Sequence, residues 1–142
     1  MVSIIQPQFL TRLNAELVDE DHDIWRLIRE LTYASNILDT ILTIPAGFTT
    51  DFDSVPRIPL AYWLTGNTGR AAAAVHDYLY QTHLCKEKSI ADNVFYEAMR
   101  ALGVPAWRSY LKWLGVKAGG QSSWVSGPSR LKIFSNDELF SM

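Results

Sequence analysis

Four consecutive alanines at positions 71–74 constrain the fold of this chain more than any other stretch. Alanine has the highest helix propensity, and its methyl side chain lets another part of the fold approach closely. The run therefore predicts a helix, "TGRAAAAVHDYLYQTH", that begins near Thr68 or Gly69. His76 and Asp77 stand within this small, apolar stretch. They are either hydrogen-bonded structural residues or the polar part of a functional site.

Two more helices are expected after this one. The segment 89–103, "SIADNVFYEAMRALG", opens with Ser89 and Asp92, which resemble a capping box in which Asp replaces the usual Glu. Pro105 suits the first turn of the next helix, "PAWRSYLKWLGVKAGG". The apolar stripe of that helix consists of Trp107, Leu111 and Leu114.

The first third of the chain favours strands. Two mixed apolar and polar runs flank "DEDHD" within residues 14–35, which predicts a hairpin. Odd-numbered residues of 25–33 are mostly apolar, as on a half-buried strand, although "WRLIREL" would also suit a helix; the hairpin is favoured. The segment "TILTIP" predicts a short strand that Pro45 closes. The predicted fold is α+β, with a small N-terminal antiparallel sheet (a hairpin plus a short strand) packed on a C-terminal bundle of three helices.

Residues 1–120 are expected to form this single α+β domain. The following segment, 121–142, is first rich in Gly and Ser and then apolar, which is typical of a flexible exit followed by a tail that docks on a neighbour.

Composition excludes several classes of protein. The net charge is −2 and basic residues form no run, which argues against a nucleic-acid partner. No apolar run approaches the roughly 20 residues of a membrane span, and the N-terminal segment lacks the pattern of a signal peptide. We therefore expect a chain made in the cytoplasm. Cys85 is the one cysteine, so an internal disulfide cannot form, and an inert thiol is favoured over a nucleophile.

The helix that contains His76 offers the first set of candidate catalytic residues. Tyr80 lies one turn after His76 and shares its face, while Asp77 points about 100° away. An imidazole can act as a base near neutral pH, and a carboxylate can bind a cation or a water. Asp92 is the less favoured partner for His76. With helix ends at Thr82 and Ser89, the two residues differ by about 4–5 Å along the helix axes, so Asp92 matches Tyr80 better.

The loop "AGFTTDFDSVPRIP" offers the second set. Asp51 and Asp53 alternate along an extended segment, so their carboxylates could converge. Two carboxylates and a histidine form a suitable set for a divalent cation, which makes Asp51 and Asp77 candidate metal ligands. Solvated or capping aspartates are the common alternative.

Three segments together resemble a known family. "IPAGFTTDFDSVPR", "AAAAVHDYLY" and "ADNVFYEAMRALGVPAWRSYLKW" follow the order seen in the domain of unknown function 1353 family of phages and prophages. The resemblance spans roughly residues 24–118. The matching positions are Gly47, Phe48, Asp51, Ser54, Pro56, Arg57, His76, Asp77, Tyr80, Asp92, Phe95 and Met99. The family usually has a small residue in place of Asp53, so Asp51 is the better candidate.

A fainter resemblance concerns the helix alone. "HDYLY" is similar to the HDxxY helix of secreted and viral phospholipases A2. The resemblance implies that His76 activates a water, that Asp77 holds calcium and that Asp92 orients the histidine. The glycine-rich calcium loop and the cysteines of those enzymes are absent.

These patterns leave two hypotheses for function. The first is a virion protein of a tailed phage, a small tail or baseplate subunit in which Asp51 or Arg57 pairs with the edge formed by His76 and Asp77. Its partners would be other virion proteins or further copies of itself. The alternative is a phage hydrolase directed at lipid or peptidoglycan, with a divalent cation as a candidate cofactor. In it His76 would be the base, Asp51 its orienter or a metal ligand, and Asp77 a cation or water ligand. A non-enzymatic metal-binding module ranks third. Burial of His76 favours the first hypothesis, and a solvent-reachable His76 favours the hydrolase.

Overall fold

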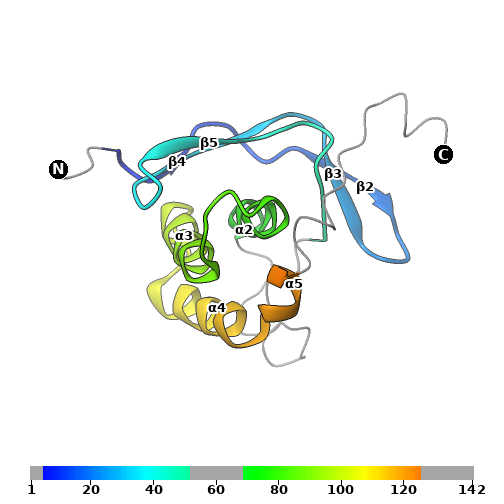
Figure 1. Cartoon of the computed structure of the whole chain (residues 1–142). Helices are drawn as coiled ribbons and strands as arrows, with labels where there is room; N and C mark the ends of the chain where they lie inside the picture. The colour runs from blue at the N-terminus through cyan, green and yellow to red at the C-terminus, as the bar shows by residue number, and fades with distance from the viewer. Residues whose placement is uncertain (1–4, 52–68, 126–142) are drawn as a thin grey trace.

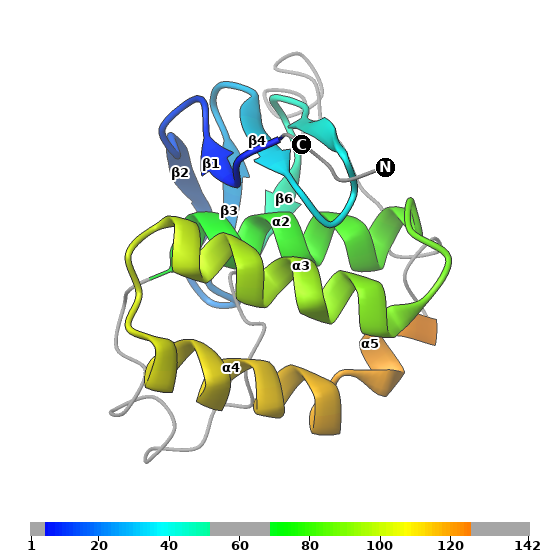
Figure 2. The ribbon, with the colours of Figure 1, turned by 90° about the vertical axis from the view of Figure 1, so that its left-hand side faces the viewer.

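The computed structural model describes residues 5–51 and 69–125. The strands of the N-terminal part cover one side of a helical layer, and a further helix covers the other side (Figures 1 and 2). The predicted α+β architecture is therefore confirmed. Within the described residues, no helix is long and apolar enough to cross a membrane.

The strands form two small antiparallel sheets instead of one. The first sheet has the order β1-β4-β5, and the second has the order β2-β3-β6. The first contains β1 (Gln8–Phe9), β4 (Leu31–Ser35) and β5 (Thr40–Ile44), and the second contains β2 (Ala15–Asp19), β3 (Ile24–Leu27) and β6 (Thr49–Thr50).

The predicted hairpin is confirmed as β2–β3, but its second strand is shorter than expected. The chain leaves the strand after Leu27 and enters the other sheet at Leu31. The predicted inward-facing positions are nevertheless correct for these residues, because Leu27, Leu31 and Tyr33 are all buried. The strand predicted from "TILTIP" is β5.

The three predicted helices are present. They are α2 (Arg70–Thr82), α3 (Lys88–Ala101) and α4 (Ala106–Gly119). The helix α2 starts after Gly69, whose φ of +90° suits a residue without a side chain. The capping box at Ser89 is wrong, because α3 begins at Lys88 with Glu87 as its N-cap and no side chain caps it.

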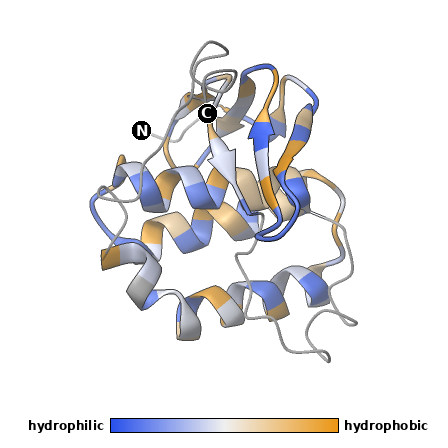
Figure 3. Cartoon of the chain, turned by 90° about the vertical axis from the view of Figure 1, so that its right-hand side faces the viewer, coloured by the Kyte–Doolittle hydropathy of each residue, from blue (hydrophilic) through white to orange (hydrophobic). Residues whose placement is uncertain are grey.

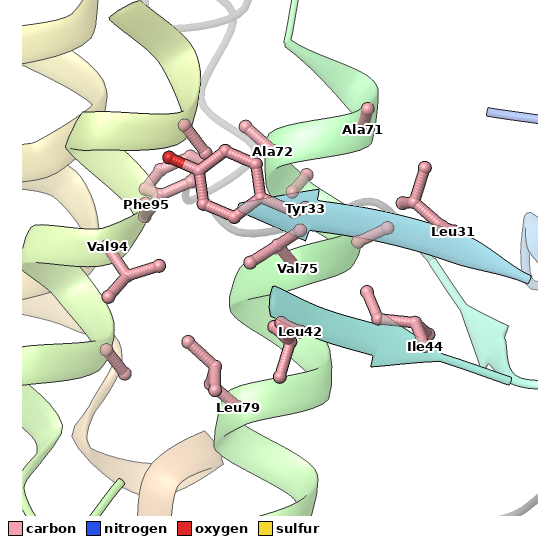
Figure 4. Close-up of a cluster of buried hydrophobic side chains, with 14 of the residues drawn as sticks. Leu31, Tyr33, Leu42, Ile44, Ala71, Ala72, Val75, Leu79, Val94 and Phe95 are labelled. Carbon is pink, nitrogen blue, oxygen red and sulfur yellow. The ribbon is translucent and has the colours of Figure 1, made fainter. Parts of the chain in front are cut away.

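The alanine run explains how the layers come together. Ala71 to Ala74 are all buried, and their small side chains fit α2 between α3, its most extensive neighbour, and the strands β4 and β5 that lie over it (Figure 4). Apolar side chains from the first sheet, from α2 and from α3 meet in one cluster. Figure 4 labels its central members, which include Leu31, Tyr33, Leu42, Ile44, Val75, Leu79, Val94 and Phe95.

The apolar stripe predicted on α4 does not face the core. The buried residues of α4 are Ser109, Lys112 and Val116. The stripe of Trp107, Leu111 and Leu114 lies on the opposite side and is exposed. The side of α4 that faces the core thus carries two small side chains and one lysine, while the large apolar side chains face outward.

The glycine- and serine-rich exit begins as a helix. The short helix α5 (Gln121–Val125) follows α4 directly, and Trp124 packs against the core. The rest of the predicted tail, 126–142, lies outside the described residues.

One carboxylate joins the first sheet to the helices. Glu97 on α3 accepts hydrogen bonds from Tyr33 Oη at 2.7 Å and from Ser35 Oγ at 2.8 Å. Its other oxygen accepts the backbone N–H of Ile37 at 3.0 Å. Both the Tyr33 and the Ser35 side chains are buried, so Glu97 supplies acceptors that water cannot.

Replacing Glu97 by alanine should therefore destabilise the protein. The substitution leaves two buried hydroxyls without this acceptor, and we expect a loss of about 2–4 kcal/mol in the free energy of unfolding, measured by urea denaturation. Glu30→Ala is the matched control, because Glu30 is exposed and lies in the segment between β3 and β4, away from every helix end. A control change above about 0.5 kcal/mol, or a Glu97→Ala change below it, would contradict this assignment.

Candidate functional site

The candidate site centres on the carboxylate of Asp92 in α3. Its Oδ1 lies 2.8 Å from His76 Nε2 and accepts a hydrogen bond from Tyr80 Oη at 2.5 Å. Its Oδ2 accepts a hydrogen bond from Lys88 Nζ at 2.8 Å. His76 and Tyr80 come from adjacent turns of α2, so one carboxylate ties two helices together.

The site is closed to solvent. His76 and Asp92 are each 2% exposed and Tyr80 is 3% exposed. The His76 ring packs against the rings of Tyr80 and Phe95, at centroid distances of 4.1 and 4.8 Å. A charged group in such a place is stable only when it is paired and hydrogen-bonded, and Asp92 meets both conditions.

Burial sets the protonation states of the pair. Burial lowers the pKa of His76, and this outweighs the opposing effect of Asp92, so the imidazole is neutral at pH 7. Burial alone would raise the pKa of Asp92, but hydrogen bonds from His76, Lys88 and Tyr80 hold that pKa below its usual range. In these states the His76 N–H at Nε2 donates to an ionised Asp92. Burial, together with the nearby carboxylate, also raises the pKa of Tyr80.

Lys88 extends the site to a third helix, and the sequence analysis missed it. Its ammonium donates to the backbone carbonyls of Val116 at 3.0 Å and Lys117 at 3.2 Å, in the last turn of α4. Those carbonyls carry the negative end of the helix dipole, which favours a cation. The pattern available in the sequence was the spacing of Lys88 and Asp92, four residues apart on one helix.

The end of α4 encloses the Tyr80 hydroxyl. A Cβ at Gly120 would lie 2.7 Å from Tyr80 Oη, so only glycine allows this approach. Trp124 of α5 contacts the Tyr80 ring edge to face at 5.4 Å and stacks on His83 at 3.8 Å. Trp124, which covers one side of the Tyr80 ring, thus belongs to the segment 121–142 that was expected to be a flexible exit.

The preference for Asp92 as a cap is corrected. The helix α3 begins one residue earlier than assumed, so Asp92 lies four residues after its start while His76 lies six before the end of α2. The axial difference is then about 3 Å, which the two side chains span. The expected match between Asp92 and Tyr80 is confirmed.

The other candidates take different places. Asp77 Oδ2 accepts a hydrogen bond from Gln81 Nε2 at 2.9 Å, one turn along α2. Asp51 is half-buried and directly follows β6. Asp53 and Arg57 lie outside the described residues. Among residues 5–51 and 69–125, no group of three or more His, Cys, Asp or Glu side chains gathers in a way that could hold a metal ion. The metal ligands proposed from the sequence stay a prediction.

Two further ionisable side chains among the helices are buried, the thiol of Cys85 and the ammonium group of Lys112. Cys85 is buried, and burial raises the pKa of its thiol, which favours the inert thiol over a nucleophile. Lys112 on α4 is also buried, and burial lowers its pKa to about 8. Its ammonium lies beside Gly69, at the start of α2.

Comparison with known proteins identifies the family. The family described as "Protein of unknown function (DUF1353)" matches residues 25–116, which is more than half of the chain. The chain belongs to this family. The match includes β3 to β6, the helices α2 and α3, and all four residues of the Asp92 site. No curated protein matches the chain, and no solved structure matches it either.

The lowered pKa of His76 gives a testable pH dependence. The imidazole binds a proton near its ordinary value of 6.5 in the unfolded chain and at lower pH in the folded one. Stability should therefore fall as the pH decreases below about 6.5, by at most about 1.4 kcal/mol per pH unit. The lowered pKa of Asp92 acts in the same direction. The stability that the ionised Asp92 contributes to the folded state is present above pH 3.8 and is lost as the pH falls below that value.

His76→Gln should flatten this dependence between about pH 7 and pH 5, since glutamine keeps an N–H donor but cannot take up a proton. Urea denaturation across that range measures the slope. His22→Gln is the control for removing a histidine elsewhere, because the His22 side chain is 75% exposed and lies 2.9 Å from Asp19 at the surface, where an ion pair contributes little to stability. An unchanged slope in His76→Gln would show that His76 is not the titrating group.

Proposed function

We propose that this protein is a structural subunit of a tailed-phage virion, an adaptor in the tail or baseplate region. The observation that carries the proposal is the burial of the Asp92 site. Its carboxylate holds His76, Tyr80 and Lys88 inside the helical layer, where all three donate hydrogen bonds to it. Such a network fixes the positions of α2, α3 and α4 relative to one another.

A structural role also explains what faces outward. Trp107, Tyr110, Leu111 and Leu114 are exposed on α4, and aromatic side chains are enriched where proteins bind one another. The polar groups with the most altered pKa values lie inside, and large apolar groups lie outside. This arrangement suits a protein that binds neighbours through a rigid surface.

The setting comes from the resemblance of the sequence to phage and prophage proteins. The partners proposed for the chain are other proteins of the tail, which it would join after synthesis in the host cytoplasm.

Mass spectrometry of purified virions tests this proposal. Particles from a phage that encodes this chain should contain it at a constant ratio to known tail proteins after density-gradient purification. A phage in which the gene carries an early stop codon should produce particles that lack the chain and have altered tails by electron microscopy. Detection in infected cells but not in purified particles would overturn the proposal.

A hydrolase is the second candidate, and the contact between His76 and Asp92 favours it. An imidazole held by a carboxylate is the pair that orients a general base, and the fainter resemblance to phospholipases A2 implies this role for Asp92. The burial of His76 opposes this function, because a base must reach its substrate.

His76→Gln separates the two functions. For a hydrolase, the variant should lose release of fatty acid from phospholipid vesicles, or of fragments from peptidoglycan, while virion assembly continues. For a structural subunit, no such activity exists in the wild type, and the variant changes only stability. Asp77→Asn is a second test of the hydrolase, because the resemblance to phospholipases A2 implies that Asp77 holds calcium. Asp77 binds Gln81 on the same helix and makes none of the Asp92 contacts described above, so the variant should leave the Asp92 site in place.

A further inference from the structure

The outward side of α4 is an apolar stripe with a basic residue on each flank. Trp107 is 52%, Tyr110 51%, Leu111 37% and Leu114 38% exposed. At 100° per residue, Arg108 falls on one edge of this stripe and Lys117 on the other. We call this set of six residues the α4 surface.

The charged residues of α4 are all basic, and two of the three, Arg108 and Lys117, flank the α4 surface while Lys112 is buried on the opposite side. Residues 106–125, which include all of α4 and α5, contain three basic residues and no acidic one. A second α4 surface placed against it would bring like charges together, which disfavours a symmetric contact between two such helices. The occupant that fits carries acidic groups beside exposed apolar ones.

The turn of the β2–β3 hairpin has that chemistry. Residues 16–23 contain five acidic residues and neither Lys nor Arg. Leu17 and Val18 in the same segment are each 40% exposed, and Glu20 and Asp21 are exposed. We call residues 17–23 the hairpin tip, and Figure 3 shows its turn as a hydrophilic loop in front of the helices.

The hairpin tip has a defined shape. Asp19 Oδ1 accepts the backbone N–H groups of Asp21 at 3.0 Å and His22 at 3.2 Å, and Asp23 accepts the indole N–H of Trp25 at 3.0 Å. These bonds hold the turn before any partner arrives, which reduces the entropy lost on binding. They also leave Glu20 and Asp21 at the outer end of the loop.

The two surfaces lie on different sides of one molecule. In Figure 1 the hairpin β2–β3 extends at the right, while α4 lies at the lower left. We propose that the hairpin tip of one copy of this chain docks on the α4 surface of a second copy. Because the two surfaces differ, the contact is head to tail, and its repetition produces a closed ring or an extended chain of copies.

This inference rests on the proposed function for its biological setting, since rings of subunits suit a phage tail, but it can be tested separately. Sedimentation velocity of the purified protein at about 50 mM NaCl should show association that grows with protein concentration. The association should weaken at about 500 mM NaCl, because exposed charges are then screened. A wild-type chain that stays monomeric at every concentration would overturn the inference.

A charge exchange identifies the two surfaces. Glu20→Lys/Asp21→Lys on the hairpin tip should weaken self-association on the order of tenfold or more, and so should Arg108→Glu/Lys117→Glu on the α4 surface. Mixing the two variants should restore assembly, because each hairpin tip then meets an α4 surface of opposite charge. Restoration distinguishes a head-to-tail contact from a loss of folding.

Controls keep the test decisive. Glu30→Lys reverses an exposed charge outside both surfaces and should leave association unchanged. Arg108 is half-buried, so Asp21→Lys with Lys117→Glu is the second pair if Arg108→Glu lowers the melting temperature. Full association of the hairpin variant, or no recovery on mixing two folded variants, would overturn the inference. Absence from virions combined with recovery on mixing would overturn only the proposed function.

Discussion

The arrangement of the helices depends on one buried carboxylate. Asp92 receives hydrogen bonds from His76 and Tyr80 of α2 and from Lys88 of its own helix, and Lys88 also binds the last turn of α4. Its negative charge is stable inside the protein only because all of these donors are present. The packing of three helices and the protonation of the histidine therefore depend on the same group.

The neighbouring parts of the fold serve this arrangement. The alanine run gives α2 small buried side chains where it packs against α3 and under the first sheet, and Gly120 leaves room for the Tyr80 hydroxyl. Glu97, five residues after Asp92, performs a similar task on the sheet side of α3 by accepting hydrogen bonds from Tyr33 and Ser35. The two carboxylates link α3 to the neighbouring helices on one side and to the first sheet on the other. The Asp92 site lies inside the molecule and the apolar groups of the α4 surface lie outside, and the proposed structural function rests on this arrangement.

Much of this fold could be predicted because local sequence determines it. The alanine run predicted α2, the alternation of Leu27, Leu31 and Tyr33 predicted inward-facing strand positions, and Tyr80 was placed beside Asp92 from helix geometry. The errors concern positions where two local rules compete. Ser89 and Asp92 fit a capping box, yet Asp92 is used as a buried acceptor. The stripe on α4 fits a core-facing helix, but a second face containing Ser109, Lys112 and Val116 packs inward.

The sequence by itself determined most of the helices and strands and the family to which the chain belongs, because backbone propensity and motif order are local properties. It also determined that His76, Tyr80 and Asp92 were the residues to consider. The tertiary structure decided that these residues meet in a buried network, that Lys88 completes it and that α4 turns its aromatic side outward. Those outcomes depend on where one helix begins relative to another and on which face each presents. With α3 starting one residue earlier than assumed, Asp92 reaches His76 as well as Tyr80, and that offset between two helices is a property of their packing.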